Sequence, residues 1–317
     1  MKHRPLAGTS LALSELGYGC AGLGGAYRPI TREEALETLS AAWEAGVRYF
    51  DVAPAYGAGA AERVLGDFLR DKPPGEYVIS TKVGKLLRPS LSISPPRMPF
   101  EIDLDYSYDG IMRSVEFSRS RLGLAKIDML FVDDLEPSTL GFSNYRRHLP
   151  AFLDTGVKAL ERLRSSGEIA AFGLGVNDVG ACIDVMHRVK LDCLLLNGRY
   201  TLLDRTAGTR VIGMCERSGT PMIVGSLFNS GALVGRETVS GTISEDVAAR
   251  AQAARQIADD ANISIDTAAV QFPLRNTLVA SALLGTTRHE RIRSAASGLA
   301  QVIPETVWGR FTSLAFN

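Results

Sequence analysis

Two patterns of apolar and polar residues alternate along the chain. Short runs rich in apolar and β-branched residues predict buried strands, and the segments between them repeat apolar residues at helical spacing. Strands are predicted to begin at Leu16 and Tyr49 and to cover 77–82, 126–132, 169–174, 193–197, 222–225 and 279–285. Helices are predicted at 31–45, 60–70, 108–122, 155–165, 180–189, 205–218, 247–262, 265–275 and 290–299.

The order of these elements predicts one large α/β fold. Strand-then-helix units occur eight times in the 317 residues, and no change of composition separates the two halves. This is the number and size of a (β/α)8 TIM barrel, so residues 1–317 are expected to form a single barrel domain. A capping box, Thr31 with Glu34, supports the first predicted helix, and Gly46 is expected to end it.

Two stretches interrupt the alternation. Residues 83–108 contain four prolines, and residues 135–151 show no clear period. Connections of this length inside a compact domain are commonly functional loops. Both are therefore expected to be long active-site loops, and the first is interpreted as a lid over the rim of the barrel.

Composition narrows the function classes. The 35 basic and 35 acidic residues cancel, so no overall field attracts nucleic acid or an anionic membrane. Cys20, Cys182, Cys193 and Cys215 form no C-x-x-C pair and indicate thiols of a reducing compartment. No signal-peptide core and no apolar run of about 18 residues is present. A cytoplasmic protein without nucleic-acid or membrane partners is predicted, and no expectation about the oligomeric state follows.

Three side chains suggest chemistry at neighbouring strand ends. Asp51 ends the second predicted strand, Lys82 ends the third, and Tyr56 lies in the turn after Asp51. Taken singly, each has an ordinary explanation: a helix cap, a solvated lysine, a packed aromatic. Because barrel strands bring their carboxyl ends to one mouth, the joint placement favours a proton-transfer device, with a lysine favouring phenolate and a carboxylate holding the lysine.

Other polar residues follow later strands and are expected at the same mouth. They are Asp133, Asn177, Asn197 and the turn after Gly225. The glycine-rich stretch 16–25 is a poor dinucleotide fingerprint, because 27–29, Tyr-Arg-Pro, separates it from the next helix. It is interpreted as the first strand with a tight turn behind it.

With these residues at barrel positions, the chain resembles the aldo-keto reductase superfamily over nearly its whole length. The motifs at 50–57, 80–84 and 113–128 carry the resemblance. Those at 105–111, 198–204 and 228–231 resemble the branch of L-fucose (D-threo-aldose 1-) dehydrogenases and pyridoxal 4-dehydrogenases. The resemblance implies an NAD(P)-dependent oxidoreductase that moves a hydride between nicotinamide and a small aldehyde or aldose.

The resemblance also implies roles for single residues. Tyr56 is the expected general acid/base, with Lys82 lowering its pKa and Asp51 orienting Lys82. Asn177 and Asn197 are expected to bind the nicotinamide carboxamide, although glutamine is usual at 197, and Tyr200 to stack under the ring. The remaining expected cofactor contacts follow the last two strands: Gly225, Ser226, Leu227, Asn229, Ser230, Gly231, Gly285, Thr287, Arg288 and Arg291.

One position departs from the family pattern. The fourth strand normally ends in a histidine, and here Asp133 stands in that place. An imidazole can donate a hydrogen bond to the substrate oxygen, whereas an ionised carboxylate only accepts. Either Asp133 is protonated, or the site works without that donor, or activity is poor. A carboxylate there would also raise the pKa of Tyr56. The structural alternative is that Asp133 caps the following loop.

Two questions about function stay open at this stage. No lysine follows the last strand to meet a 2′-phosphate, which favours NAD slightly, but Arg288 or Arg291 could bind that phosphate. The alternative function is a cofactor-binding, weakly catalytic sensor or regulatory subunit, suggested by Asp133. A metal-dependent hydrolase is disfavoured, because none of the four histidines lies at a predicted strand end.

Overall fold

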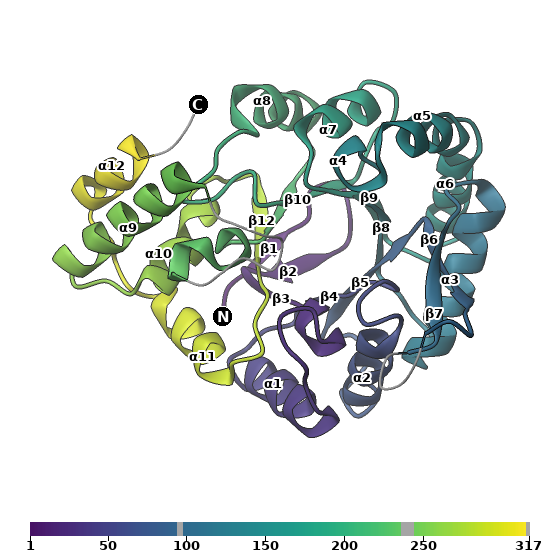
Figure 1. Ribbon diagram of the computed structural model, residues 1–317, viewed down its shortest axis with the longest axis horizontal. Coiled ribbons are helices and arrows are strands. Elements are labelled where there is room, and N and C mark those ends of the chain that lie inside the picture. Colours follow the sequence, from purple (N-terminus) through teal and green to yellow (C-terminus); the bar gives the residue numbers. More distant parts are fainter. Residues whose placement is uncertain (94–97, 236–243, 315–317) are drawn as a thin grey trace.

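Eight parallel strands close into a barrel at the centre of the molecule (Figure 1). The computed structural model describes all residues except 94–97, 236–243 and 315–317. Each barrel strand pairs with the next one along the chain, and the last pairs with the first through Ala282 and Leu16. This confirms the predicted (β/α)8 fold. The strands are β3 (Leu16–Gly19), β4 (Tyr49–Asp51), β5 (Val78–Val83), β8 (Met129–Asp133), β9 (Ala171–Val176), β10 (Cys193–Asn197), β11 (Met222–Gly225) and β12 (Val279–Leu284).

Helices surround the barrel as an outer ring (Figure 1). Their buried faces pack on outward side chains of the strands, as Leu39 and Leu160 do in the main apolar core. The predicted capping box of Thr31 and Glu34 begins the first helix. The helices are α1 (Arg32–Glu44), α2 (Ala60–Leu69), α3 (Tyr108–Leu122), α6 (Val157–Ser165), α7 (Val179–Met186), α8 (Gly208–Ser218), α9 (Glu245–Asp260), α10 (Ile265–Leu274), α11 (His289–Gly298) and α12 (Glu305–Ser313).

A short hairpin closes the amino-terminal end of the barrel, and the sequence pattern did not predict it. It consists of β1 (His3–Pro5) and β2 (Ala12–Ser14), which pair antiparallel. Its leucines, Leu6 and Leu13, pack with inward side chains from the strand beginnings, including Met129 and Cys193. The opposite, carboxyl end of the strands is left for the candidate site.

Residues 83–108, predicted to be a long active-site loop, contain two strands that the sequence pattern did not predict. β6 (Lys85–Pro89) and β7 (Phe100–Leu104) form an antiparallel hairpin in register from Lys85 with Leu104 to Pro89 with Phe100. Residues 100–104 alternate apolar and acidic side chains, which is the period of a strand. Pro89 is the last residue of β6 and Pro99 lies just before β7, whereas Pro95 and Pro96 lie outside the described residues.

Residues 135–151 are also more regular than predicted. They contain α4 (Pro137–Leu140) and α5 (Phe142–Ala151), followed by the short π-helix η2 (Phe152–Gly156). Pro137 lies in the first turn of α4, where a missing N–H costs nothing, and Pro150 lies near the end of α5. Two 3-10 segments, η1 (Cys20–Gly24) and η3 (Asn229–Val234), follow β3 and β11.

None of the described helices combines the length and hydropathy that a membrane span requires.

Candidate active site

Asp51 and Lys82 meet in a buried ion pair at the carboxyl ends of β4 and β5. Lys82 Nζ donates to Asp51 Oδ2 at 2.5 Å and to the Val52 carbonyl at 3.1 Å. Ser80 Oγ donates to the other carboxylate oxygen at 2.7 Å. The two charged side chains are 3% and 4% exposed, so the pair is held in one geometry away from water. The structure thus brings together the two strand-end residues that the sequence singled out.

Tyr56 lies against this pair. Lys82 Nζ is 4.9 Å from the centre of the Tyr56 ring. The turn that carries Tyr56 is clamped on the segment after β3, because a Cβ on Gly24 would lie 2.4 Å from the Tyr56 carbonyl carbon. Gly57, with φ +61°, packs equally closely on Gly24. The two glycines therefore allow the close backbone approach that holds this turn in place.

The charges of the trio are set by burial and by each other. Burial raises the pKa of Tyr56, Lys82 lowers it, and Asp51 and Asp133 raise it, with a net pKa well above the ordinary value of 10. Burial lowers the pKa of Lys82, but Asp51, Tyr56 and Asp133 more than offset this and raise it. Lys82 therefore stays an ammonium. Its effect on Tyr56 has the expected direction but is outweighed by burial.

Asp133 lies at the end of β8 and pairs with a lysine that sequence reasoning missed. Lys85 Nζ is 3.3 Å from Asp133 Oδ2 and 2.6 Å from Asp134 Oδ2. Tyr106 Oη donates to the Asp133 main-chain carbonyl at 2.7 Å. Within the described ranges no backbone N–H donates to the Asp133 carboxylate, so the interpretation of this residue as a loop cap is wrong. Lys85 could have been found from the sequence, because it directly follows the strand that carries Lys82 and so lies at the same end of the barrel.

The two predicted carboxamide-binding residues are held differently. Asn177 Nδ2 donates to Asp134 Oδ1 at 3.1 Å and to Glu136 Oε1 at 3.0 Å. Both N–H groups of the amide are thus used, so any further hydrogen bond of this side chain would be accepted by its oxygen. Asn197 packs on Gly225, where a Cβ would lie 2.2 Å from Asn197 Oδ1. Glycine at 225 is therefore required by the side chain of Asn197.

Tyr200 is half-buried beside the barrel. Its ring centre is 5.5 Å from that of Phe272 on α10, so one part of the ring is packed by the protein. The intermediate exposure leaves an aromatic surface in the loop after β10. This is compatible with the predicted stacking role.

The loop after β11 suits a phosphate. Ser226, Asn229 and Ser230 have φ of +54°, +46° and +56°, and Gly231 has φ +104°. Tight turns of this kind can point main-chain N–H groups at a common anion, although the N–H groups of Asn229 and Gly231 already donate to the carbonyls of Ser226 and Phe228. The Leu227 side chain is buried in the core, so only its backbone is available. The N–H groups of 226–228 donate to no acceptor in the described part of the chain. These free donors fit a pyrophosphate, at the position after the seventh strand where barrels commonly bind one.

Of the cofactor-binding residues predicted after β12, most contact other side chains of the protein, and one forms no side-chain hydrogen bond or ion pair in the described part of the chain. Gly285 is covered by Tyr27, whose hydroxyl would lie 2.3 Å from a Cβ there. Arg28 Nε donates to Thr287 Oγ1 at 3.2 Å. Arg291 is held by Asp266 at 3.0 Å and stacks on the Phe228 ring. Arg288 is exposed, and its side chain makes no hydrogen bond or ion pair with any described residue. Of the two predicted phosphate ligands, Arg288 is the available one.

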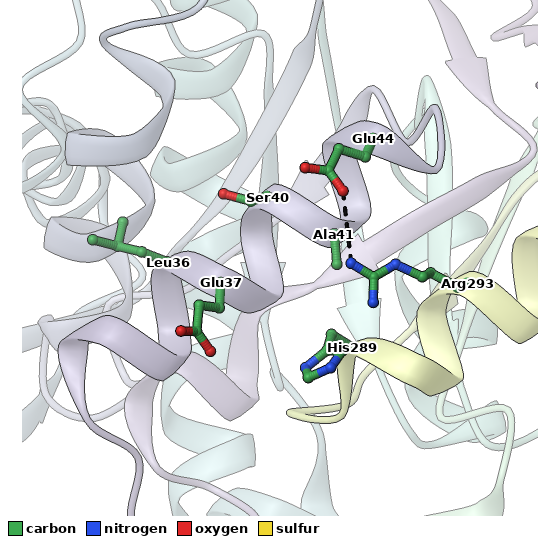
Figure 2. Close-up of a pocket in the computed structure, with 7 residues that line it drawn as sticks. All are labelled: Leu36, Glu37, Ser40, Ala41, Glu44, His289 and Arg293. Atoms are coloured by element: carbon green, nitrogen blue, oxygen red, sulfur yellow. Dashed lines mark ion pairs between the residues drawn. The ribbon is translucent and has the colours of Figure 1, made fainter.

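A surface hollow elsewhere does not overlap this site. It lies between α1 and α11 on the outside of the barrel, and an ion pair of 3.6 Å between Arg293 and Glu44 crosses it (Figure 2). Its lining consists of Leu36, Glu37, Ser40, Ala41, Glu44, His289 and Arg293. None of these is a predicted site residue.

The chain is similar to known proteins in both sequence and fold. The model of the Aldo/keto reductase family matches residues 15–315. Pyridoxal 4-dehydrogenase of Microbacterium luteolum is 38% identical, with 97% of this chain and 95% of that protein covered. D-threo-aldose 1-dehydrogenase of Pseudomonas sp is 35% identical, with coverage of 95% and 94%. An aldo-keto reductase structure from Bacillus halodurans is similar in fold, with a TM-score of 0.79, 20% identity and coverage of 100% and 97%.

Proposed function

The chain belongs to the aldo/keto reductase family, and from this premise we propose that it oxidises the cyclic hemiacetal of a small aldehyde or aldose with NAD(P). It is an oxidoreductase with a TIM-barrel fold. The observation that carries the proposal is the buried Lys82 ammonium, held between the Asp51 carboxylate and the Tyr56 ring at the mouth of the barrel.

The substrate class rests on what the two similar proteins share. One is named for pyridoxal and the other for an aldose, and both are dehydrogenases. An open aldehyde has no O–H on the carbon that would lose a hydride. Aldoses close into rings, and the hydroxymethyl group of pyridoxal closes on its aldehyde in the same way. The resulting hemiacetal carries C–H and O–H on one carbon, and its oxidation yields a lactone.

Each residue of the trio Asp51, Tyr56 and Lys82 is proposed to have its own role in the reaction. Tyr56, when ionised, accepts the proton of the substrate hydroxyl, and in the reverse direction the phenol protonates the carbonyl oxygen. Lys82 stabilises the phenolate electrostatically, and Asp51 holds Lys82 charged and in place. A bound nicotinamide supplies the hydride acceptor. The C–H electron pair leaves with the hydride, the O–H proton goes to Tyr56, and the lactone C=O forms, so atoms and electrons balance.

The cofactor is proposed to lie across the carboxyl ends of the last strands. The Asn177 amide oxygen and Asn197 would hold its carboxamide, and Tyr200 would pack under the ring. Support for the pyrophosphate position comes from the free N–H groups of 226–228 and the left-handed residues Asn229, Ser230 and Gly231. NAD is slightly favoured over NADP, because Arg291 is already paired with Asp266. Exposed Arg288 is the group that would accept NADP.

The test is a substrate panel with both cofactors. L-Fucose, other aldoses and pyridoxal are incubated with NAD or NADP, and reduced cofactor is followed by absorbance. Oxidation of at least one hemiacetal, with lactone as the product, is expected. Tight cofactor binding without turnover of any member would contradict the proposal and support the sensor alternative. That alternative is otherwise not favoured, since both similar proteins are named as dehydrogenases.

A further inference from the structure

A second buried charge cluster lies beside the Asp51–Lys82 pair. Lys85 is only 7% exposed, and its Nζ lies between the carboxylates of Asp133 and Asp134, at 3.3 and 2.6 Å. Asp133 is 5% exposed, and its charge raises the pKa of both Tyr56 and Lys82. The cluster is therefore electrostatically part of the reacting centre, although Lys85 belongs to no expected site.

The backbone around this cluster is built to hold it. Gly84 turns the chain out of β5 with φ +101°, and a Cβ there would lie 2.2 Å from the Tyr106 ring. The hydroxyl of the same Tyr106 donates to the main-chain carbonyl of Asp133 at 2.7 Å. One buried tyrosine thus fixes the strand end before Lys85 and the strand end that carries Asp133.

The charge state of the cluster follows from its neighbours. Burial lowers the pKa of Lys85, but Asp133 and Asp134 raise it to a net value above the ordinary one, so Lys85 is a cation. Burial and Asp133 raise the pKa of Asp134, while Lys85 opposes this. Behind Tyr106 lies His148, whose pKa is lowered by burial and by Arg147. The titratable groups that interact with Asp133 are Tyr56, Lys82, Lys85, Tyr106 and Asp134, and Glu136 acts on Tyr106.

One oxygen of Asp133 is free to meet a ligand. Lys85 approaches Oδ2, and no described residue donates a hydrogen bond to Oδ1. An ionised carboxylate accepts hydrogen bonds and cannot donate them. A substrate hydroxyl can donate to Oδ1, whereas a carbonyl oxygen would meet a second acceptor. Where a histidine would offer a donor to a carbonyl, this chain offers an acceptor to a hydroxyl.

We propose that Lys85 is a positioning residue that holds the Asp133 carboxylate at the mouth, and that Asp133 accepts a hydrogen bond from the substrate's hemiacetal hydroxyl while Tyr56 is protonated. When Tyr56 ionises, the same O–H turns to the phenolate and transfers its proton there. The proposal rests on the proposed function and adds a reason why this barrel takes the hydroxyl form of its substrate. It assigns a role to a lysine outside the Asp51, Tyr56 and Lys82 trio.

The first experiment measures equilibrium binding instead of turnover. Dissociation constants of L-fucose and 1-deoxy-L-fucose, which lacks only the anomeric hydroxyl, are determined by calorimetry in the presence of NADH. If pyridoxal is the better substrate, it is paired with the cyclic ether that lacks its hemiacetal hydroxyl. The wild type is expected to prefer the hydroxyl compound about tenfold or more, as for a hydrogen bond to a charged group. Asp133→Asn is expected to lose most of that preference.

The second experiment isolates Lys85 by its effect on pH dependence. The wild-type preference is expected to be flat between pH 6 and 9. In Lys85→Met, two neighbouring carboxylates without a cation share a proton to higher pH, so the preference is lost as the pH falls and returns as it rises. Lys85→Arg keeps the positive charge and is expected to restore the flat profile.

A matched control exists at the other end of the same strand. Lys126 pairs with Asp128 at 2.6 Å just before β8, and its side chain is 68% exposed. Lys126→Met is expected to leave the preference and its pH profile unchanged. Thermal melts of each variant show that it is folded before its affinity is interpreted.

The outcomes separate this inference from the proposed function. Equal affinity of the wild type for the two ligands, or an unchanged preference in Asp133→Asn, overturns the role of Asp133. A flat profile in folded Lys85→Met overturns the role of Lys85. In each case, continued oxidation of a hemiacetal leaves the proposed function intact. A wild type that oxidises no hemiacetal overturns the function itself.

Discussion

The ammonium of Lys82 lies 4.9 Å from the centre of the Tyr56 ring, with the carboxylate of Asp51 on its other side at 2.5 Å. This arrangement places a buried positive charge next to a half-buried phenol. The charge favours the ionised phenol, and burial disfavours it. The balance between these two effects determines at what pH the site can accept a proton.

The rate of oxidation is predicted to rise with pH. Burial raises the pKa of Tyr56, and Asp51 and Asp133 add to this against Lys82, so the phenol keeps its proton at neutral pH. Below the raised pKa, the ionised fraction grows about tenfold per pH unit, and kcat/KM for oxidation should follow it between pH 7 and 9. Asp133→Asn removes one charge that raises the pKa of Tyr56, so the rise of kcat/KM with pH should be shifted to lower pH in this variant. A rate independent of pH over this range would contradict the role of Tyr56.

The Asp51–Lys82 pair is predicted to matter for stability. Asp51→Asn leaves a buried ammonium without its counter-ion and should lower the free energy of unfolding by about 3 kcal/mol at pH 7. The folded pKa of Lys82 is raised, so the stabilisation is complete below its unfolded pKa of about 10.4 and is lost as the pH rises through the folded value. Urea denaturation measures both effects.

An exposed pair provides the control for that experiment. Asp67 pairs with Arg32 at 2.7 Å, with side chains 36% and 57% exposed. Asp67→Asn should cost no more than about 1 kcal/mol. Equal losses of unfolding free energy in Asp51→Asn and Asp67→Asn would mean that the buried Asp51–Lys82 pair stabilises the fold no more than an exposed ion pair does.

The loop after β11 is predicted to decide cofactor affinity. Gly231 has φ +104°, which a residue with a Cβ adopts only with strain, so Gly231→Ala should deform this loop. The dissociation constant for NAD, measured by quenching of protein fluorescence, should rise about tenfold, equivalent to about 1.4 kcal/mol. Gly75→Ala is the control, since Gly75 has φ +90° but lies in the turn before β5. A similar loss in both variants would indicate general destabilisation.

The two arginines after β12 are predicted to differ. Arg288 is exposed with no side-chain partner among the described residues, so Arg288→Gln should weaken NADP binding about tenfold by removing a charged hydrogen bond to the 2′-phosphate, and leave NAD binding unchanged. Arg291→Gln breaks the contact with Asp266 and should lower stability without changing the NAD to NADP ratio. If Arg291→Gln alone changes that ratio, the assignment is reversed.

Much of the fold could be predicted because strand ends carry strong local signals. Asp51 and Lys82 follow buried apolar runs, and the rule that parallel strands share one mouth brings them together before any coordinates are known. The same rule indicated Asp133 and Asn177. The three-residue strands β1 and β2 were missed because runs so short have no readable period.

The contacts of individual side chains could not be predicted in the same way. Lys85 follows Gly84, and the direction of its side chain depends on a left-handed turn and on the ring of Tyr106. Arg291 was a possible phosphate ligand until its pairing with Asp266 on a neighbouring helix was seen. Such contacts join residues far apart in sequence, and no local pattern encodes them. The hairpin of β6 and β7 was hidden for a simpler reason, because four prolines outweighed a clear alternation at 100–104.

The most direct test of the account is Tyr56→Phe, examined for both turnover and cofactor binding. Removing only the phenol oxygen should lower kcat/KM for hemiacetal oxidation by at least about a hundredfold, since a general acid/base contributes factors of this size. The dissociation constant for NAD should change by less than about twofold, because Tyr56 holds no part of the cofactor. Loss of NAD binding together with turnover, or turnover that survives the change, would contradict the proposed role of Tyr56.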